Sequence, residues 1–195
     1  MALTFDDGPN DPYTLQLLEL LDRYQAKATF FLIGKYVRQR PEIARAIQAA
    51  GHAIGNHTES HPNLIFVSAG RLRQELERCG QALEDALGQR VGWFRPPFGG
   101  RRPAVLRMAR ELKMEPVMWS VTGFDWNAKS SQAIVQRVSQ LDRRRRAQGE
   151  IILLHDGGHL AFGTNRRFTI EATGKLLERY SGTRKFVALP DLSLQ

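Results

Sequence analysis

Short apolar runs alternate with longer amphipathic stretches along this chain. The apolar runs are rich in β-branched and aromatic residues and are bounded by turn-forming residues, a pattern that predicts strands. Seven such runs are present: Ala2–Phe5, Ala28–Leu32, His52–Gly55, Trp93–Arg95, Pro116–Val121, Ile151–His155 and Phe186–Leu189.

Helical periodicity fills the stretches between these runs. The clearest case has apolar residues at spacings of three and four from Leu72 to Leu87, with Ser68 placed to cap the start and Gly88 to end the helix. The same spacing predicts five further helices, around Leu17–Leu21, Pro41–Ile47, Pro103–Leu112, Ile134–Leu141 and Ile170–Leu177. Regular alternation of strand and helix indicates a parallel sheet with helices outside it.

Seven strand–helix units are too few for a complete eight-unit barrel. The chain has 195 residues, whereas such a barrel usually needs about 250 residues. We therefore predict an α/β fold, a distorted and incomplete (β/α)7 barrel with a parallel sheet and outer helices, in preference to a flat doubly wound sheet. Because no linker, low-complexity tract or internal repeat interrupts the pattern, we expect a single domain spanning residues 1–195.

Composition and charge narrow the class of protein. Hydrophobic residues make up 42% of the chain and charged residues 25%, which is typical of a globular protein. No apolar run approaches the roughly 20 residues that cross a bilayer, so we expect no transmembrane contact. The net charge of +8 favours anionic partners in general, but no nucleic-acid recognition motif is present, and we expect no nucleic-acid partner.

Much of the positive charge lies in Arg143–Arg146, which we interpret as a solvated helix end. The single cysteine, Cys79, excludes an intrachain disulfide. No signal-peptide pattern precedes the first predicted strand. We therefore expect a cytoplasmic protein if the chain is complete, and an extracytoplasmic one if it is a trimmed fragment. The oligomeric state stays open.

Polar residues follow the predicted strands, at the end of a parallel sheet where α/β proteins bind ligands. Asp6 and Asp7 end the first strand and precede a Gly8-Pro9 turn. One carboxylate could hold a metal while the other acts as a base. The alternative is a simple turn, because Asp-Gly-Pro is also ordinary turn chemistry.

His57 and His61 follow the third predicted strand. Their four-residue spacing places both imidazoles on one side of a helical turn, from which both reach one metal ion. Two histidines and a carboxylate are a common donor set for catalytic zinc, with a position left for water. The zinc-protease pattern does not fit, because Glu59 sits elsewhere and Pro62 prevents a long helix. The alternative is a surface or capping role for each histidine.

Three later segments add candidate polar groups. Arg95 precedes two prolines and can hold a carboxylate. Asp125 is flanked by aromatic residues, which suggests a sugar-stacking wall at Trp126, whereas we expect Trp119 in the core. His155 ends the most apolar strand and is a candidate proton donor.

His159 repeats the four-residue spacing after His155. Because it follows Gly157 and Gly158, we expect it to be a mobile loop residue and not a ligand.

These segments, in this order, resemble the polysaccharide deacetylase family (carbohydrate esterase family 4), which includes nodulation-factor and peptidoglycan deacetylases. Thr4-Phe5-Asp6-Asp7-Gly8-Pro9 and His57-Thr58-x-x-His61-Pro62 are specific as a pair, and Arg95-Pro96-Pro97-x-Gly99 and Leu153-x-His155 support them in context. The resemblance covers nearly the whole chain and implies a distorted barrel of about seven β/α units.

The resemblance also implies a role for each matching position. It implies metal ligation by Asp7, His57 and His61, and general-base catalysis by Asp6, with Arg95 orienting that base. His155 corresponds to the general acid, tuned by Asp125. The Phe98 backbone N–H corresponds to an oxyanion donor, although many relatives have tyrosine there. Substrate contacts are implied for three further residues, which are Trp126, Leu153 and Pro96.

The implied activity is metal-dependent hydrolysis of N-acetyl groups on an N-acetylhexosamine-containing glycan, with release of acetate. One divalent ion is implied. An aspartate and two histidines suit Zn²⁺ and also accept Co²⁺ or Ni²⁺. Two alternatives remain open at this point: an O-acetyl esterase or small-amide hydrolase that uses the same site, and a non-catalytic glycan-binding relative.

Overall fold

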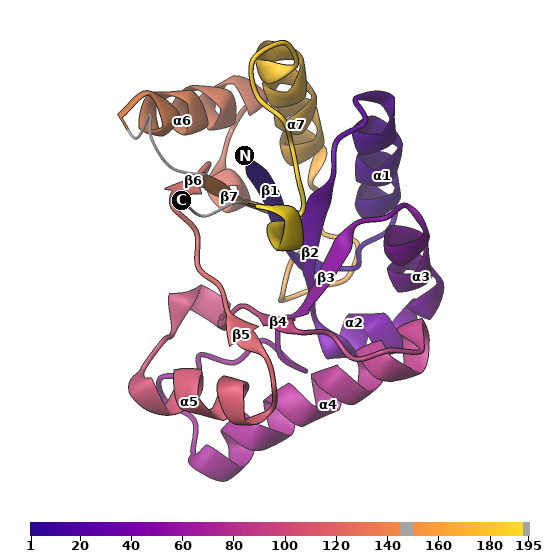
Figure 1. Ribbon diagram of the computed structural model, residues 1–195, viewed down its shortest axis with the longest axis vertical. Coiled ribbons are helices and arrows are strands. Elements are labelled where there is room, and N and C mark those ends of the chain that lie inside the picture. The colour runs from indigo at the N-terminus through magenta and orange to yellow at the C-terminus, as the bar shows by residue number, and fades with distance from the viewer. Residues whose placement is uncertain (145–149, 193–195) are drawn as a thin grey trace.

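The computed structural model describes residues 1–144 and 150–192. Within these ranges, seven parallel strands form one sheet in the order β5-β4-β3-β2-β1-β7-β6. The strands are β1 (Ala2–Gly8), β2 (Ala28–Leu32), β3 (Ala53–Asn56), β4 (Trp93–Phe94), β5 (Glu115–Pro116), β6 (Val121–Thr122) and β7 (Ile151–His155). The sheet curls into a half-barrel with helices around it (Figure 1), which confirms the predicted fold class.

The helices lie outside the sheet. They are α1 (Tyr13–Arg23), α2 (Gly34–Gln39), α3 (Pro41–Ala49), α4 (Ala69–Leu87), α5 (Pro103–Glu111), α6 (Ser131–Arg144) and α7 (Arg167–Tyr180). Six of them match the predicted helices, and α4 has the predicted ends: Ser68 accepts a hydrogen bond from Arg71 N, and Gly88 is left-handed. Helix α2 was not predicted, because six residues are too few to show a helical period.

Two predicted strands are wrong. Pro116–Val121 is not one strand: β5 and β6 lie at opposite edges of the sheet, and residues 117–120 run between them. Phe186–Leu189 is not a strand either. Phe186 and Leu189 are buried against the sheet, and the chain turns into a 3-10 helix at Leu189–Asp191. This apolar run packs on the core without joining the ladder of strands.

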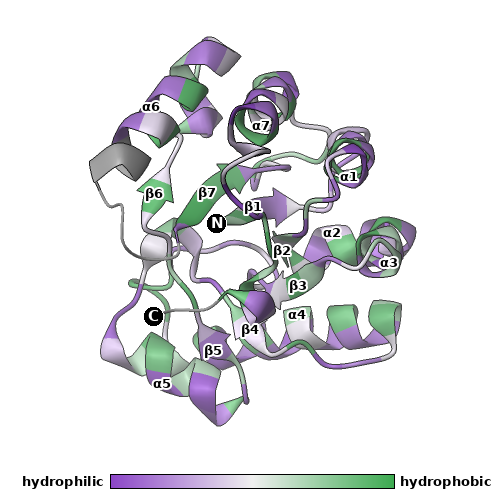
Figure 2. Ribbon diagram, turned by 45° about the horizontal axis from the view of Figure 1, so that its top comes forward, coloured by the Kyte–Doolittle hydropathy of each residue, from purple (hydrophilic) through white to green (hydrophobic). Residues whose placement is uncertain are grey.

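The main core lies between the sheet and the helices on its outer face. Alternate residues of the central strands, such as Leu3, Phe5, Ile152 and Leu154, pack there against apolar faces of helices α1, α6 and α7. Each such buried side chain contributes about 1.5–3 kcal/mol of transfer free energy. Figure 2 shows β7 hydrophobic along its length, whereas the outer helices alternate between hydrophobic and hydrophilic residues.

A second, smaller core lies near the edge of the sheet formed by β4 and β5. There Phe94 of β4 packs with Leu72 and Leu76 of α4 and with Val105 and Ala109 of α5.

No helix of the described residues is both long and apolar enough to cross a membrane. The interpretation of Arg143–Arg146 as a solvated helix end stays a prediction, because α6 ends at Arg144 and the side chains of that run lie outside the described residues.

Candidate active site

Two adjacent carboxylates reach one cavity because strand β1 is irregular at its end. Neighbouring residues of a regular strand point to opposite faces. Here the register of β1 against β2 shifts between Asp6 and Gly8, and Asp7 has a positive φ of 72°. This bulge turns the second carboxylate toward the side of the first. Asp6 and Asp7 are both 3% exposed and line the same cavity.

The loop after β3 carries the two predicted histidines, but the predicted helical turn is wrong. Residues 57–61 form an irregular loop with positive φ at Thr58 and His61. Thr58 N donates to Asn56 Oδ1 (2.9 Å), and His61 N donates to Thr58 Oγ1 (3.0 Å). These local hydrogen bonds replace those of a helix, and the imidazoles still converge on one carboxylate.

A buried acid of α4 holds the outer side of this loop. Glu75 is 1% exposed, and its carboxylate accepts hydrogen bonds from Ser60 N and Ser60 Oγ, both at 2.8 Å. Arg71, one helical turn earlier, pairs with the same carboxylate. Glu75 therefore positions the loop that presents His61.

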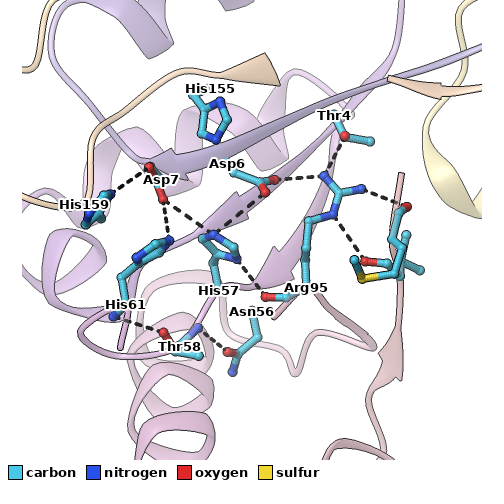
Figure 3. A network of polar contacts seen from close by, with 12 residues as sticks. Thr4, Asp6, Asp7, Asn56, His57, Thr58, His61, Arg95, His155 and His159 are labelled. Carbon is cyan, nitrogen blue, oxygen red and sulfur yellow. Dashed lines mark hydrogen bonds and ion pairs between the residues drawn. The ribbon is translucent and has the colours of Figure 1, made fainter. Parts of the chain in front are cut away.

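Figure 3 shows three histidines pointing toward Asp7. His61 Nε2 lies 3.1 Å and His57 Nε2 lies 3.5 Å from Asp7 Oδ1. The other ring nitrogen of His57, Nδ1, lies 2.7 Å from Arg95 O. This contact suits an Nδ1–H donor and leaves the lone pair of Nε2 directed at Asp7.

The donor chemistry of this grouping fits a divalent cation. Among the described residues, Asp7 Oδ1 and His61 Nδ1 are buried without a hydrogen-bond partner. A buried carboxylate oxygen that faces imidazole nitrogens without hydrogen-bonding them is typical of a metal-ligand set. Burial alone would raise the pKa of Asp7, but His159, His57 and His61 keep that pKa well below its usual range.

His159, which was expected to be a mobile loop residue and not a ligand, is in a loop, but this loop places it at the site. Its ring stacks on that of His61, with centroids 4.4 Å apart and planes at 20°. Its Nδ1 lies 3.7 Å from Asp7 Oδ2. One donor atom each from Asp7, His61 and His159 lie within 4.8 Å of one another. In the sequence, the four-residue spacing between His155 and His159 was the signal for a place at the site. The two glycines before His159 suggested a mobile loop instead.

Asp6 is held by a buried guanidinium. Arg95 is fully buried, and its Nη1 donates to Asp6 Oδ1 (2.9 Å) and to Thr4 Oγ1 (2.6 Å). The guanidinium also stacks over the Phe31 ring at 4.1 Å. Burial lowers the pKa of Arg95, and the charge of Asp6 opposes this shift. The second oxygen, Asp6 Oδ2, is left 3.8 Å from His57 Nε2.

His155 and Asp125 form a second carboxylate–imidazole pair. His155 Nδ1 lies 2.8 Å from Asp125 Oδ1, and His155 N donates to Asp125 Oδ2 (2.8 Å). Thr169 Oγ1 donates to the same Oδ2 at 2.8 Å. Burial would lower the pKa of His155, but the Asp125 carboxylate raises it to about 9. Burial would raise the pKa of Asp125, but the charge and hydrogen bond of His155, the hydrogen bond from Thr169 and the charge of Arg166 together lower it.

These groupings meet at a cavity of about 680 Å³. Arg95 and Asp125 do not line it, but they contact Asp6 and His155, which do. All the other predicted site residues line it, and so do residues that were not predicted, among them Trp119, which was expected in the core. The lining residues are Asp6, Asp7, His57, His61, Pro96, Phe98, Trp119, Trp126, Leu153, His155, Gly158, His159, Leu160, Thr164, Asn165 and Arg166.

Aromatic rings form much of the cavity wall. Phe98 has a positive φ of 55°, and its side chain is 60% exposed and meets the ring of His61 edge-on at 4.7 Å. Trp126 is 47% exposed and lies edge-on to His155 at 5.3 Å. The exposed aromatic ring of Trp126 offers a face on which a sugar ring could stack.

A buried acid next to His155 was missed by the sequence reasoning. Asp156 is fully buried and accepts a hydrogen bond from Thr14 at the start of α1. Its backbone carbonyl accepts from Asn10 Nδ2 (2.8 Å). Burial raises the pKa of Asp156 to about 7. Asp156 therefore joins the loop after β7 to the loop after β1.

Comparison with known proteins identifies a matching family and similar proteins. Residues 1–117 match the sequence model of the family described as polysaccharide deacetylase. A chitooligosaccharide deacetylase of Azorhizobium caulinodans is 38% identical over 156 residues, which are 80% of this chain and 72% of that protein.

Two solved structures are similar over nearly the whole chain. A peptidoglycan N-acetylglucosamine deacetylase superposes with a TM-score of 0.88 at 33% identity, over 98% of this chain and 86% of that one. A pseudoenzyme of carbohydrate esterase family 4 from Bacillus anthracis has a TM-score of 0.84 at 29% identity, over 98% of this chain and 64% of that one.

Proposed function

This chain belongs to the polysaccharide deacetylase family, and we propose that it removes acetyl groups from N-acetylhexosamine units of a glycan and releases acetate. One observation carries the proposal. A carboxylate ringed by imidazoles (Asp7), an arginine-held carboxylate (Asp6) and a carboxylate-held imidazole (His155) all line one cavity. Amide hydrolysis needs a cation site, a base and an acid of these kinds.

Asp7, His57 and His61 would hold one divalent cation. Zn²⁺ suits this set of one oxygen and two nitrogen donors, and Co²⁺ or Ni²⁺ also accept it. When bound, such an ion supplies Lewis-acid chemistry, polarising the acetyl carbonyl and making water more acidic. The observation that supports a cation here is that Asp7 Oδ1 is buried and faces the imidazoles of His57 and His61 without a hydrogen bond.

Asp6 acts as the general base in this proposal. Its Oδ1 is occupied by Arg95, so Oδ2 is the atom left to accept a proton from the attacking water. The hydrogen bond from Arg95 Nη1 fixes the direction of the Asp6 carboxylate. The Phe98 N–H would donate to the oxyanion that forms on the acetyl carbonyl.

His155 acts as the general acid. Because its Nδ1 faces Asp125, Nε2 is the atom that gives a proton to the departing nitrogen. A pKa of about 9 keeps this imidazole protonated at neutral pH. The carbon–nitrogen bond then breaks, the acetyl carbon keeps the oxygen from water as acetate, and the sugar keeps a free amine. Trp126, Leu153 and Pro96 would contact the sugar and its acetyl group.

The test measures released acetate and bound zinc in the same samples. We expect the zinc-loaded protein to release acetate from chitooligosaccharides or peptidoglycan fragments. Asp6→Asn should lower kcat by about 100-fold or more, because general-base catalysis contributes about 10²–10⁴, and should still bind one zinc ion. Asp85→Asn, an exposed residue of α4, is the matched control and should match the wild type.

Three results would overturn parts of the proposal. Acetate release from acetylated xylan alone would make the chain an O-acetyl esterase. Glycan binding without any acetate release would place it with the pseudoenzymes. Turnover by Asp6→Asn at the wild-type rate would remove Asp6 from the role of base.

A further inference from the structure

The loop that carries His159 is fixed by hydrogen bonds at three consecutive carbonyls. Arg166 Nε donates to Gly157 O at 2.6 Å. Tyr36 Oη donates to Gly158 O at 3.1 Å, and Lys35 Nζ donates to His159 O at 2.9 Å. Donors from α2 and from the residue before α7 thus hold the backbone of this segment, so the position of His159 is built into the fold.

Gly157, two residues before His159, allows the loop to pass close to Asp7. A Cβ atom on Gly157 would lie 2.0 Å from Asp7 O, and one on Gly158 would lie 2.4 Å from Thr164 Oγ1. Neither position accommodates a side chain. Gly157 therefore provides the close approach of this loop to Asp7, and the His159 ring lies beside the Asp7 carboxylate.

The His159 ring has the surroundings expected of a metal ligand. His159 Nδ1 faces Asp7 Oδ2 at 3.7 Å, and the ring lies flat on His61. We infer that His159 is a fourth protein donor to the cation held at Asp7, His57 and His61. This inference rests on the cation site of the proposed function and adds a donor to it.

Exposure indicates which donor can be exchanged. The side chain of His159 is 34% exposed, compared with 3% for His57 and 5% for His61. Four protein donors close a tetrahedral zinc site, whereas catalysis needs a position for water or substrate. His159 is therefore the donor that substrate displaces, while the two buried imidazoles and Asp7 stay in place.

Zinc titration of the full chain labelled with ¹⁵N-histidine tests this inference by NMR, without any measurement of activity. We expect the ring ¹⁵N signals of His57, His61 and His159 to shift together and to saturate at one equivalent of zinc. His159→Ala identifies the third signal. Shifts of His57 and His61 alone would overturn the fourth donor and leave the proposed function intact. If none of the three signals shifts, the proposed cation site itself is wrong.

Zinc affinity, measured by competition with a chelating dye, gives a second and independent readout. His159→Ala and His159→Gln should each weaken zinc binding by about tenfold or more, because even partners of metal ligands affect affinity by about 10–100-fold. Ala161→Ser, at an exposed position of the same loop that does not line the cavity, is the matched control and should bind zinc like the wild type. Wild-type affinity in both His159 variants would overturn the inference.

Discussion

Two carboxylate–imidazole groupings, one at Asp7 and one at Asp125, present imidazoles to the same cavity, and they differ in hydrogen bonding. At Asp125, a single imidazole nitrogen lies 2.8 Å away, and a backbone N–H and a threonine hydroxyl complete the carboxylate's hydrogen bonds. At Asp7, three imidazoles approach at 3.1–3.7 Å, yet Oδ1 has no hydrogen-bond partner among the described residues.

The difference shows how the same residue types give different chemistry. One carboxylate stabilises one imidazolium when the proton lies in a short hydrogen bond between them, which raises the pKa of His155 to about 9. One carboxylate cannot do this for three imidazoles, which would repel one another if charged. Burial lowers the pKa of His61, which favours the neutral form that binds metals.

Removing a buried imidazole from the Asp7 grouping should have the largest effect. His61→Ala deletes a proposed ligand, so zinc affinity should fall by more than about 100-fold, since partners outside the ligand set already give about 10–100-fold. Dye competition measures the affinity, and circular dichroism checks the fold. An affinity within threefold of the wild type would contradict the assignment of His61 to the cation.

A substitution in the Asp125 grouping should change the pH dependence of kcat/KM. In the wild type the protonated His155 is present at low pH and is lost as pH rises through about 9, so kcat/KM should fall on that basic limb. Asp125→Asn removes the charge that raises this pKa, while burial still lowers it. The basic limb should therefore move at least one unit toward acid, which costs about tenfold in rate near pH 9.

A pH–rate profile from pH 5 to 10 measures this shift (a range chosen around reference pKa values). Thr169→Val is the matched variant, because it removes a hydrogen bond from Asp125 and keeps the charge. It should move the limb less than Asp125→Asn. An unmoved limb in Asp125→Asn would mean that Asp125 does not set the pKa of the acid.

Loosening the loop of the Asp7 grouping should have an intermediate effect. Glu75→Gln weakens the two bonds to Ser60 and the pair with Arg71. We expect a loss of about 1–2 kcal/mol in the free energy of unfolding and about tenfold weaker zinc binding. Urea unfolding and dye competition measure the two quantities. Glu77→Gln, at an exposed position of the same helix, should change neither, and equal effects of both variants would contradict the positioning role.

The smallest effect is expected at the cavity wall shared by the two groupings. Phe98→Tyr adds a hydroxyl to a ring that is 60% exposed, without changing the backbone N–H. Exposed substitutions usually alter free energies by less than about 0.5 kcal/mol, so kcat/KM should change by less than about threefold. Acetate-release kinetics measure it. A tenfold gain would show that the missing hydroxyl takes part in the reaction.

The class of fold and most of the residues of the site could be predicted from residue patterns alone. Strand and helix periodicities alternate along the chain, and parallel strands bring their carboxyl ends to one edge, so residues such as Asp6, Asp7 and His155 were expected together. The caps of α4 were also predicted, because Ser68 and Gly88 act through local backbone chemistry.

Other features depend on contacts between residues distant in sequence, and residue patterns did not predict them. Residues 116–121 split between opposite edges of the sheet, and Trp119 joined the cavity instead of the core. The imidazoles of His57 and His61 converge through an irregular loop held by Glu75, not through a helical turn. His159 reaches Asp7 because donors distant in sequence hydrogen-bond the backbone carbonyls of its loop, and because Gly157 permits close contact with Asp7. Periodicity records local preference, whereas these positions are set by contacts between segments far apart in the chain.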